Sequence, residues 1–285
     1  MPKHQMTITR FAPSPTGFLH LGHAFAAFNA WKRARDAGGR FLLRLEDIDP
    51  GRCRPAYANA IQEDLTWLGL DWDGPVRVQS EHLPEYQAVL DRLAELGLLY
   101  PCFCTRADIA REVAASAAAP HQPDGATRYP GTCRQLTRAE RTYRIEVGQR
   151  FVLRLDITAS VRRASSYGEL SYEEDGAGRI ACHPERFGDV VLARKDAPAS
   201  YHLCVTHDDA LQGITVVTRG IDLKPATGLH RLLQALMGWS EPIYAHHRLL
   251  TDAAGNRLAK RDKAGTLRSL RAEGESARAI IQRFG

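Results

Sequence analysis

Two histidines, His20 and His23, are spaced so that both could act on one ligand. They end the stretch R-F-A-P-S-P-T-G-F-L-H-L-G-H, which begins at Arg10 and leads into an Ala-rich amphipathic segment. Side chains three residues apart share one face of a helix, and a helix start offers free backbone N–H groups and the positive end of the helix dipole. Two imidazoles added there predict a pocket for a polyphosphate. Without further context, two surface histidines at a helix start would be the more ordinary interpretation.

Three of the six cysteines, Cys102, Cys104 and Cys133, form the one cluster among otherwise scattered thiols. This spacing argues against a disulfide framework and indicates a local metal site. Zinc prefers four ligands in a tetrahedral, thiolate-rich arrangement. His121 would be the chemically ordinary fourth ligand and Tyr129 an unusual one, and three unrelated reduced thiols are the remaining alternative. With four protein ligands no position is left for a catalytic water, so such a zinc would be structural.

Charged residues at predicted strand ends indicate a further site. Glu46 follows the apolar run R-F-L-L-R-L, and Arg10 and Arg219 each follow a β-branched run. Open α/β sheets bind ligands at the carboxyl ends of their strands, so we expect these side chains to face one cleft. A planar guanidinium group can grip a carboxylate with two hydrogen bonds.

The elements that must position these residues follow from the apolar periodicity. The predicted helices are 21–37, 56–68, 83–96, 227–237 and 267–284. The predicted strands are 7–9, 40–45, 150–157, 214–218 and 243–245, with 178–193 adding to the same small sheet as 150–157. Strands alternating with helices predict an α/β fold with a parallel sheet.

Composition sets broad limits on function. The formal charge of +5 and the pI near 8.9 permit a nucleic-acid partner without requiring one. No secretory signal and no apolar run near 18 residues is found, so we expect a soluble cytoplasmic protein that does not enter a membrane. No obligate protein partner is evident.

The stretch 10–23 resembles the H-I-G-H signature of class I aminoacyl-tRNA synthetases, in the form F-A-P-S-P-T-G-x-x-H-x-G-H used by glutamyl-type enzymes. Three later segments are also similar to that family: L-R-L-E-D-I-D from 43, D-V-V-L-A-R-K-D from 189 and P-A-S-Y-H-L from 198. The resemblance implies that His20, Gly22, His23 and Lys260 bind ATP, with His20, His23 and Lys260 catalytic. It also implies that glutamate is bound by Arg10, Ala12, Ser14, Glu46, Tyr201 and Arg219. Glu46 would hold the amino group, and either arginine could hold the side-chain carboxylate.

The segment N-R-L-A-K-R from 256 resembles the second signature of these enzymes, K-M-S-K-S, in its glutamyl form K-L-S-K-R. Arg257 replaces the first lysine and Ala259 replaces the serine. Lys260 keeps the lysine that the family uses to contact the phosphates.

The cysteine pattern C-x-C…Y-x-x-x-C resembles that of the glutamyl-queuosine tRNA(Asp) synthetases, a short paralogue group of glutamyl-tRNA synthetase. This resemblance implies one structural zinc held by Cys102, Cys104, Tyr129 and Cys133. It further implies that L-glutamate is activated by ATP with Mg²⁺, without tRNA, and is transferred to queuosine at the wobble position of tRNA(Asp). Only 24 residues follow Arg261, too few for the anticodon-binding region of full glutamyl-tRNA synthetases. The alternatives are a truncated glutamyl-tRNA synthetase charging tRNA(Glu) and an inactive paralogue that only binds tRNA.

The expected architecture is therefore a Rossmann-like parallel-sheet core with an inserted zinc-containing α+β subdomain. Residues 1–100 would form the first half of the catalytic core and 101–195 the insertion. Residues 196–242 would form the second half of the core, and 243–285 a short C-terminal segment with the K-M-S-K-S-like loop.

Overall fold

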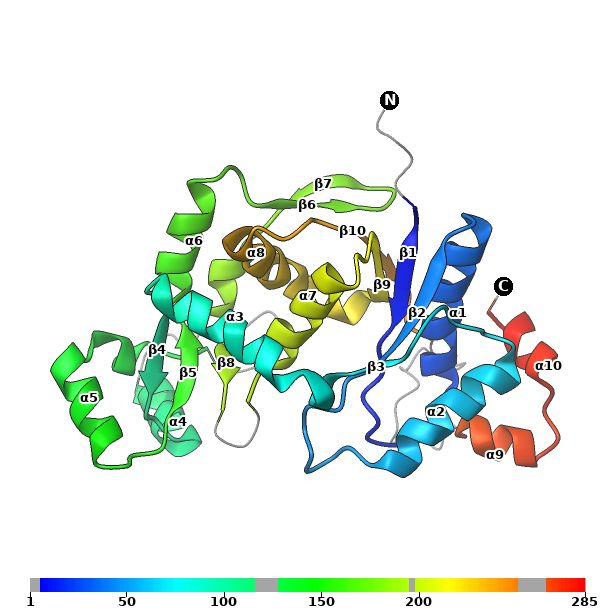
Figure 1. Cartoon of the computed structure of the whole chain (residues 1–285), viewed down its shortest axis with the longest axis horizontal. Helices are drawn as coiled ribbons and strands as arrows, with labels where there is room; N and C mark the ends of the chain where they lie inside the picture. The colour runs from blue at the N-terminus through cyan, green and yellow to red at the C-terminus, as the bar shows by residue number, and fades with distance from the viewer. Residues whose placement is uncertain (1–5, 116–127, 195–197, 251–264, 285) are drawn as a thin grey trace.

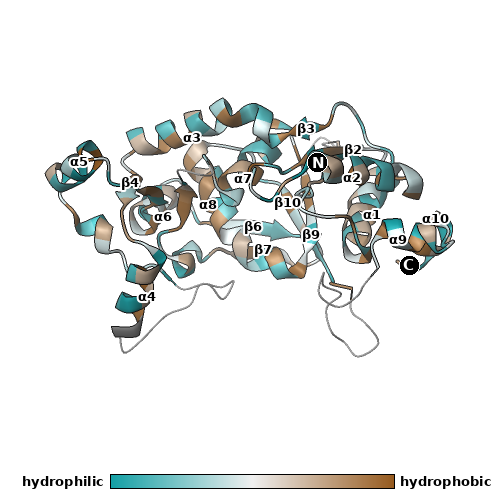
Figure 2. Cartoon of the chain, turned by 90° about the horizontal axis from the view of Figure 1, so that it is seen from below, coloured by the Kyte–Doolittle hydropathy of each residue, from teal (hydrophilic) through white to brown (hydrophobic). Residues whose placement is uncertain are grey.

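The computed structural model describes residues 6–115, 128–194, 198–250 and 265–284. The chain forms an elongated molecule, with helices α4 (Arg106–Ala115) and α5 (Arg138–Glu146) at one end. Helices α9 (Leu267–Ala272) and α10 (Ala277–Gln282) lie at the other end (Figures 1 and 2). The elements between them are the ones that position the candidate site.

The first half of the core is a parallel sheet in the order β1-β2-β3. Strand β2 (Arg40–Leu45) is buried at every position after its first, as expected for a parallel strand covered on both faces. Its neighbours are β1 (Ile8–Phe11) and β3 (Arg77–Val78). Helix α1 (Leu21–Asp36) connects β1 to β2, and α2 (Pro55–Leu68) connects β2 to β3.

The turn from α1 into β2 requires a glycine, because two backbone segments approach closely there. A Cβ atom on Gly39 would lie 2.0 Å from the carbonyl oxygen of Thr7, so only glycine fits there. On the helix itself, buried alanines let α1 lie close to the sheet, and the Thr9 hydroxyl donates to the Ala30 carbonyl at 2.7 Å. These contacts fix the position of α1 relative to β1.

The second half of the core is a four-stranded sheet in the order β7-β6-β10-β9. Strand β10 (Ile243–His247) runs parallel to both β9 (Val216–Gly220) and β6 (Ser171–Glu174). Strand β9 lies beside β1, and the Thr215 N–H donates to the Ile8 carbonyl at 3.0 Å (Figure 1). The strand order reverses between β1 and β9, and such a switch point is where open α/β sheets bind ligands.

Helices α3 (Leu83–Glu95), α7 (Tyr201–Leu211) and α8 (Thr227–Met237) contribute to the larger buried apolar cluster of the core. The predicted helices 56–68, 83–96 and 227–237 are confirmed to within a residue at each end. Helix α7 was not predicted, nor were α5 and α6 (Ile157–Ser165). Short 3-10 segments complete the path at Gln79–His82, Thr132–Gln135, Pro184–Phe187 and Ile221–Ala226.

A small antiparallel sheet in the order β4-β5-β8 falls largely within the predicted insertion, residues 101–195. Its strands are β4 (Leu99–Cys102), β5 (Val152–Leu155) and β8 (Val191–Ala193). The prediction that all of 178–193 adds to this sheet is wrong for β7 (Gly178–Ala181), which pairs with β6 in the core sheet. Ile180 of β7 packs against the buried cluster that contains Tyr172 of β6 and Tyr244 of β10, so apolar burial favours the core position of β7.

The predicted single helix over 267–284 is also wrong, because the chain forms two helices there. Gly274 lies between them with φ of +91°, a conformation that ends a helix and favours glycine. Ser276 then caps α10 by accepting the Ala279 N–H. Leu267, Ile280 and Phe284 are buried against the α1 side of the core.

Candidate active site

His20 and His23 form a reciprocal cap at the start of α1. His20 is the N-cap residue in extended conformation, one position before the predicted first turn, and its Nδ1 accepts the Gly22 N–H at 3.0 Å. His23 Nδ1 accepts the His20 N–H at 3.3 Å, and the two ring centroids are 3.8 Å apart. With both Nδ1 atoms accepting, each neutral ring carries its proton on Nε2, a donor suited to a phosphate oxygen.

Gly22 is explained by the same cap. A Cβ atom at this position would lie 2.9 Å from Cε1 of His20. A side chain at position 22 would therefore displace the imidazole of His20 from this cap, which links Gly22 of the first signature to the placement of His20.

One cavity of about 360 Å³ brings together all the residues predicted to bind glutamate. They come from β1 and the loop after it, from the end of β2, from the start of α7 and from β9. These residues are Arg10, Ala12, Ser14, Glu46, Tyr201 and Arg219. His23 lines the same cavity, so the cap of α1 and the expected amino-acid pocket share one space.

Glu46 is buried at the end of β2, and its Oε1 has no hydrogen-bond partner among the described residues. Burial raises the pKa of this carboxyl to about 7, against the opposing influence of Arg44 and Arg10. A buried carboxylate oxygen without a donor is costly unless a ligand supplies one. A ligand ammonium group would do so.

Arg10 is neutralised within the protein. Its Nε donates to Oδ1 of Asp209 at 2.9 Å and its NH2 nitrogen to Oδ2 at 3.3 Å, while its NH1 nitrogen donates to the Thr218 carbonyl at 3.1 Å. Arg44, wholly buried, also pairs with Asp209. Burial alone would raise the pKa of Asp209, but the two arginines hold it below its ordinary value. Sequence reasoning missed this role because it did not predict α7, which carries Asp209.

Arg219 has a different environment, although it is as deeply buried. Among the described residues no carboxylate forms an ion pair with it. Its NH1 nitrogen contacts Nδ1 of His230 at 2.9 Å, its Nε donates to Nε2 of His246 at 3.1 Å, and its NH2 nitrogen donates to the Thr227 hydroxyl at 2.6 Å. Burial and the neighbouring guanidinium lower the pKa of both histidines, that of His246 to about 4.

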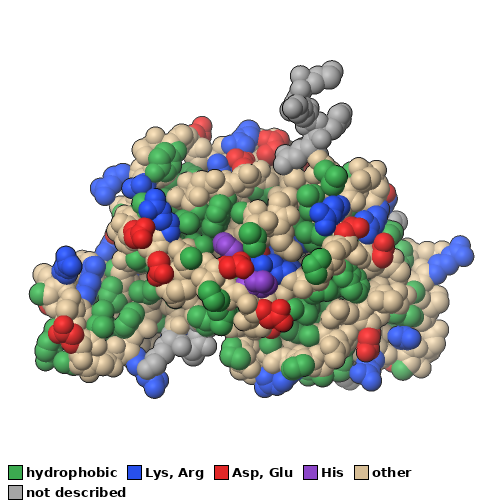
Figure 3. Space-filling model, in the orientation of Figure 1, with side chains coloured by type: hydrophobic (Ala, Val, Ile, Leu, Met, Phe, Trp, Pro, Cys, Tyr) green, Lys and Arg blue, Asp and Glu red, His purple; other side chains and the backbone are tan. Residues whose placement is uncertain are grey.

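A second cavity of about 540 Å³ adjoins the first and shares Ser14, Thr16, Glu46 and Tyr201 with it. Four arginines from the core and the insertion line it: Arg52, Arg106, Arg154 and Arg194. Figure 3 shows basic and acidic side chains interspersed over one face of the molecule, with histidines near its middle. The concentration of arginines in this cavity is typical of a site for a polyanionic ligand.

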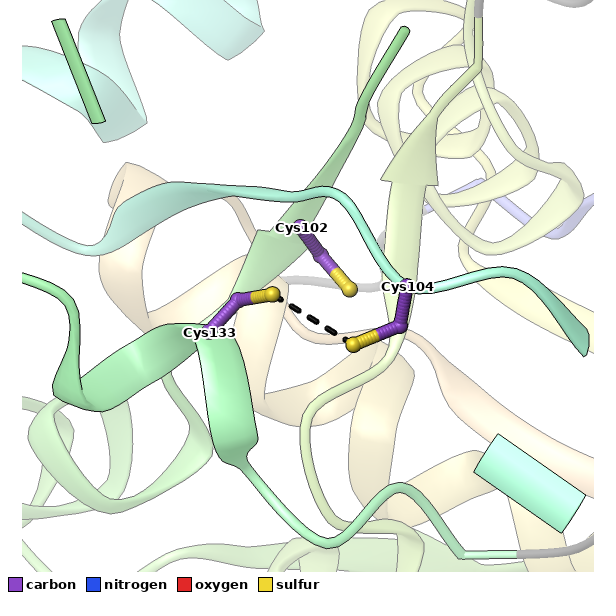
Figure 4. Close-up of side chains that lie close together, drawn as sticks. All are labelled: Cys102, Cys104 and Cys133. Carbon is purple, nitrogen blue, oxygen red and sulfur yellow. Dashed lines mark hydrogen bonds between the residues drawn. The ribbon is translucent and has the colours of Figure 1, made fainter. Parts of the chain in front are cut away.

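The three clustered cysteines converge in the insertion, where their sulfur atoms all lie within 4.8 Å of one another. Cys102 ends β4, Cys104 follows it, and Cys133 lies in the segment Thr132–Gln135 (Figure 4). The Sγ atoms of Cys104 and Cys133 are 3.4 Å apart, and Oη of Tyr129 lies 3.4 Å from Sγ of Cys104. Ligand atoms about 2.3 Å from a tetrahedral centre are roughly 3.8 Å apart, so this donor set fits a metal such as zinc. His121 lies outside the described residues.

Lys260, together with Arg257 and Ala259, also lies outside the described residues. The residues just after this segment lie beside the cap of α1. Thr266 forms an isolated antiparallel bridge with His20, and the Leu267 N–H donates to the Leu19 carbonyl at 2.8 Å. The residues that follow the second signature are thus anchored beside the first.

The fold and this site define a class of protein that the comparisons identify directly. Residues 6–285 match the family model of the class I tRNA synthetases (E and Q), catalytic domain. The chain belongs to this family of ligases. It is 50% identical over 98% of its length to the glutamyl-Q tRNA(Asp) synthetase of Rhodobacter capsulatus, of which it covers 99%. It is 38% identical over 96% of its length to the glutamate–tRNA ligase of Aquifex aeolicus, of which it covers 55%.

Solved structures agree with the family. The glutamate–tRNA synthetase of Elizabethkingia anophelis superimposes with a TM-score of 0.79 at 27% identity, over 98% of this chain and 61% of that one. The chain therefore spans about three fifths of the solved glutamate enzyme. The methionyl-tRNA synthetase of Mycobacterium tuberculosis, at 12% identity and a TM-score of 0.61, shows the shared fold alone. Within the residues described here, no helix has both the length and the apolar character needed to span a membrane.

Proposed function

We propose that this chain activates L-glutamate with ATP, without tRNA, and transfers the glutamyl group to queuosine at the wobble position of tRNA(Asp). One observation carries the amino-acid assignment: within the described residues, a single cavity holds a buried guanidinium, that of Arg219, with no carboxylate partner and a buried carboxylate oxygen, that of Glu46, with no donor. These two groups complement one carboxylate and the ammonium group of glutamate. The relatives named glutamyl-Q tRNA(Asp) synthetase support the choice of acceptor.

Arg219 is the better candidate for the side-chain carboxylate. The α-carboxylate loses its charge when it becomes the mixed anhydride of glutamyl-AMP, whereas the side-chain carboxylate keeps its charge throughout the reaction. Arg10 already has Asp209 as its counter-ion, but Arg219 relies on neutral acceptors. A permanently charged partner for Arg219 would keep this buried guanidinium compensated at every step. Glu46 would bind the ammonium group and Tyr201 would line the pocket.

The activation step is an in-line displacement at phosphorus. An oxygen of the glutamate α-carboxylate bonds to the α-phosphorus of ATP, and the bond to the bridging oxygen of pyrophosphate breaks. The Nε2–H groups of His20 and His23 would stabilise negative charge that develops on the phosphate, and Lys260 would contribute a further cation. Mg²⁺ would enter with ATP and offset charge on the departing pyrophosphate.

Transfer follows in the adjoining arginine-lined cavity. A hydroxyl of the cyclopentenediol of queuosine would attack the carbonyl carbon of glutamyl-AMP, forming an ester and releasing AMP. Because the two cavities share Glu46 and Tyr201, an acceptor bound in one could reach an adenylate bound in the other. The arginines would pair with phosphates flanking the modified nucleotide.

The cysteine cluster would hold one structural zinc through Cys102, Cys104, Cys133 and Tyr129. The three sulfurs and the phenol oxygen converge within ligand-to-ligand distances suited to a tetrahedral ion. Such an ion would stabilise the fold of the insertion. The guanidinium of Arg154 lies 3.9 Å from the centroid of the Tyr129 ring, which connects this cluster to the acceptor cavity.

Glutamate-dependent exchange of pyrophosphate into ATP, measured with and without tRNA, tests the first half of the proposal. Aspartate and glutamine serve as comparison substrates, and an inactive paralogue would give no exchange. The second half is tested by following labelled glutamate onto purified tRNA(Asp) and tRNA(Glu), with tRNA(Asp) lacking queuosine as control. An alkali-labile 3′ ester on tRNA(Glu) would instead establish the rival function, a truncated glutamyl-tRNA synthetase.

A further inference from the structure

Behind Arg219 lies a set of histidines that neither signature motif accounts for. His230, on α8, and His246, on β10, contact two different nitrogens of this guanidinium, and Thr227 contacts the third. His230 is 3% exposed, and the side chain of His246 is fully buried. Arg219 is therefore held on all three nitrogens by groups from two elements.

The direction of every hydrogen bond in this set follows from Arg219, because a guanidinium can only donate. Nδ1 of His230 must accept, so the proton of its neutral ring is on Nε2, which donates to Nδ1 of His202 at 3.0 Å. Nε2 of His246 must accept, so its proton is on Nδ1, which donates to Glu174 at 2.8 Å. A second proton on either ring would place an N–H group against an N–H group of Arg219. Both histidines must therefore be neutral.

In the part of the chain that the structure describes, no carboxylate contacts Arg219 directly. The carboxylate on this side is Glu174, which is separated from Arg219 by the ring of His246 and also faces Lys224 at 3.7 Å. Other described groups that face the two histidines are uncharged: the hydroxyl of Thr227 and the ring of His202, and also the rings of Tyr201 beside His230 and Tyr244 beside His246. Had a carboxylate taken the place of either imidazole, Arg219 would be neutralised as Arg10 is.

We propose that His230 and His246 are positioning residues: they fix Arg219 as neutral acceptors and thereby reserve its charge for the side-chain carboxylate of the substrate, which sets the preference for glutamate over glutamine. This inference rests on the proposed function for its choice of substrate. Its structural half, the pair of ring tautomers, is independent of any reaction.

The tautomers provide the first test. In ¹⁵N-histidine-labelled protein without substrate, long-range proton–nitrogen correlation spectra report which ring nitrogen carries the proton. We expect Nδ1–H for His246 and Nε2–H for His230, each assigned by the disappearance of its signals in H246Q or H230N. Nε2–H on His246, or a doubly protonated ring on either residue at neutral pH, would overturn the proposed network.

Paired substitutions provide the second test. Asn places an oxygen near the position of Nδ1 and Gln near that of Nε2, so H230N and H246Q keep the acceptor toward Arg219, while H230L and H246L remove it. In the exchange assay we expect each Leu variant to raise the glutamate KM about 10- to 100-fold, as for loss of a hydrogen bond to a charged group. We expect little change in kcat and a loss of about tenfold in the preference for glutamate over glutamine. The Asn and Gln variants should stay within about threefold of wild type.

H247L is the matched control, since His247 adjoins His246 on β10 but contacts the Arg248 carbonyl instead. Circular dichroism and thermal melting establish that each variant is folded. Folded Leu variants with wild-type glutamate KM and selectivity would overturn the proposal. Absence of glutamate binding by the wild-type chain in calorimetry would contradict the proposed function instead, and the tautomer measurement would still decide whether the network exists.

Discussion

Two arginines at the carboxyl ends of neighbouring strands line the same cavity and differ in almost nothing but their partners. Arg10 and Arg219 are the penultimate residues of β1 and β9, and each is 5% exposed. Arg10 is paired with the carboxylate of Asp209, whereas Arg219 donates to two imidazoles and a hydroxyl. A buried cation with a buried counter-ion is part of the framework, and one held by neutral groups is prepared for an anionic ligand. Residue type and strand position alone do not distinguish the two.

The largest expected effect separates the two arginines directly. Substituting Arg219→Ala should raise the glutamate KM by about 100-fold or more, because the proposed buried contact to the substrate carboxylate would be lost. Stability should change little, since the substitution leaves neutral acceptors and no buried charge. The exchange assay gives KM, and urea denaturation gives the free energy of unfolding. A glutamate KM like that of wild type would remove Arg219 from the pocket.

The opposite pattern is expected on the Arg10 side. Substituting Asp209→Asn leaves Arg10 and Arg44 without their shared carboxylate, and breaking such a buried pairing costs about 3–5 kcal/mol of unfolding free energy. The matched control is D175N, which removes an exposed partner of Arg33 and should cost at most about 1 kcal/mol. Equal destabilisation by the two variants in urea denaturation would contradict the comparison.

The contribution of Asp209 has a defined dependence on pH. Its folded-state pKa lies below the ordinary value, so its stabilisation is complete above the unfolded pKa of about 3.9 and is lost as the pH falls through the folded value. The stabilities of wild type and D209N should therefore converge in acid. A constant difference down to low pH would mean that the carboxylate charge is not what stabilises the pair.

Glu46 gives a smaller, pH-dependent effect on the ligand side of the comparison. Its pKa is raised to about 7 by burial, so below that value the carboxylate is increasingly protonated and cannot pair with an ammonium group. We expect the glutamate KM to rise up to about tenfold per unit as the pH falls below 7. Folding stability should increase over the same pH range in which glutamate binding weakens. Protonation relieves a buried charge, so the free energy of unfolding rises as the pH falls from 7 toward the pKa of Glu46 in the unfolded chain. In E46Q both dependences should flatten, and a glutamate KM independent of pH in wild type would exclude this role.

The sequence predicts the positions of these residues better than their partners. The strand β2, the strand-end location of Glu46 and the convergence of Arg10, Glu46 and Arg219 follow from apolar runs and from the rule for parallel sheets. The partners could not be predicted, because pairing depends on tertiary placement. Asp209 lies on a helix whose apolar pattern is interrupted by buried polar residues, so periodicity does not reveal α7. The contact between Arg219 and His246 joins residues 27 positions apart, and no local pattern encodes it.

The cysteine cluster supplies the last and smallest effect on activation, because it lies in the insertion, outside the cavity that holds the two arginines. Substituting Cys102→Ser should remove zinc and local order, since three remaining ligands hold the ion weakly, but should cost only part of the glutamate-dependent exchange. Atomic absorption measures the metal, and C182S, which alters a cysteine packed in the core, is the matched control.

Transfer of glutamate to tRNA should be reduced more than activation in C102S, because Arg154 links Tyr129 to the acceptor cavity. One zinc per chain in C102S would make the metal assignment wrong, and equal losses in activation and transfer would contradict the separation between the insertion and the amino-acid pocket.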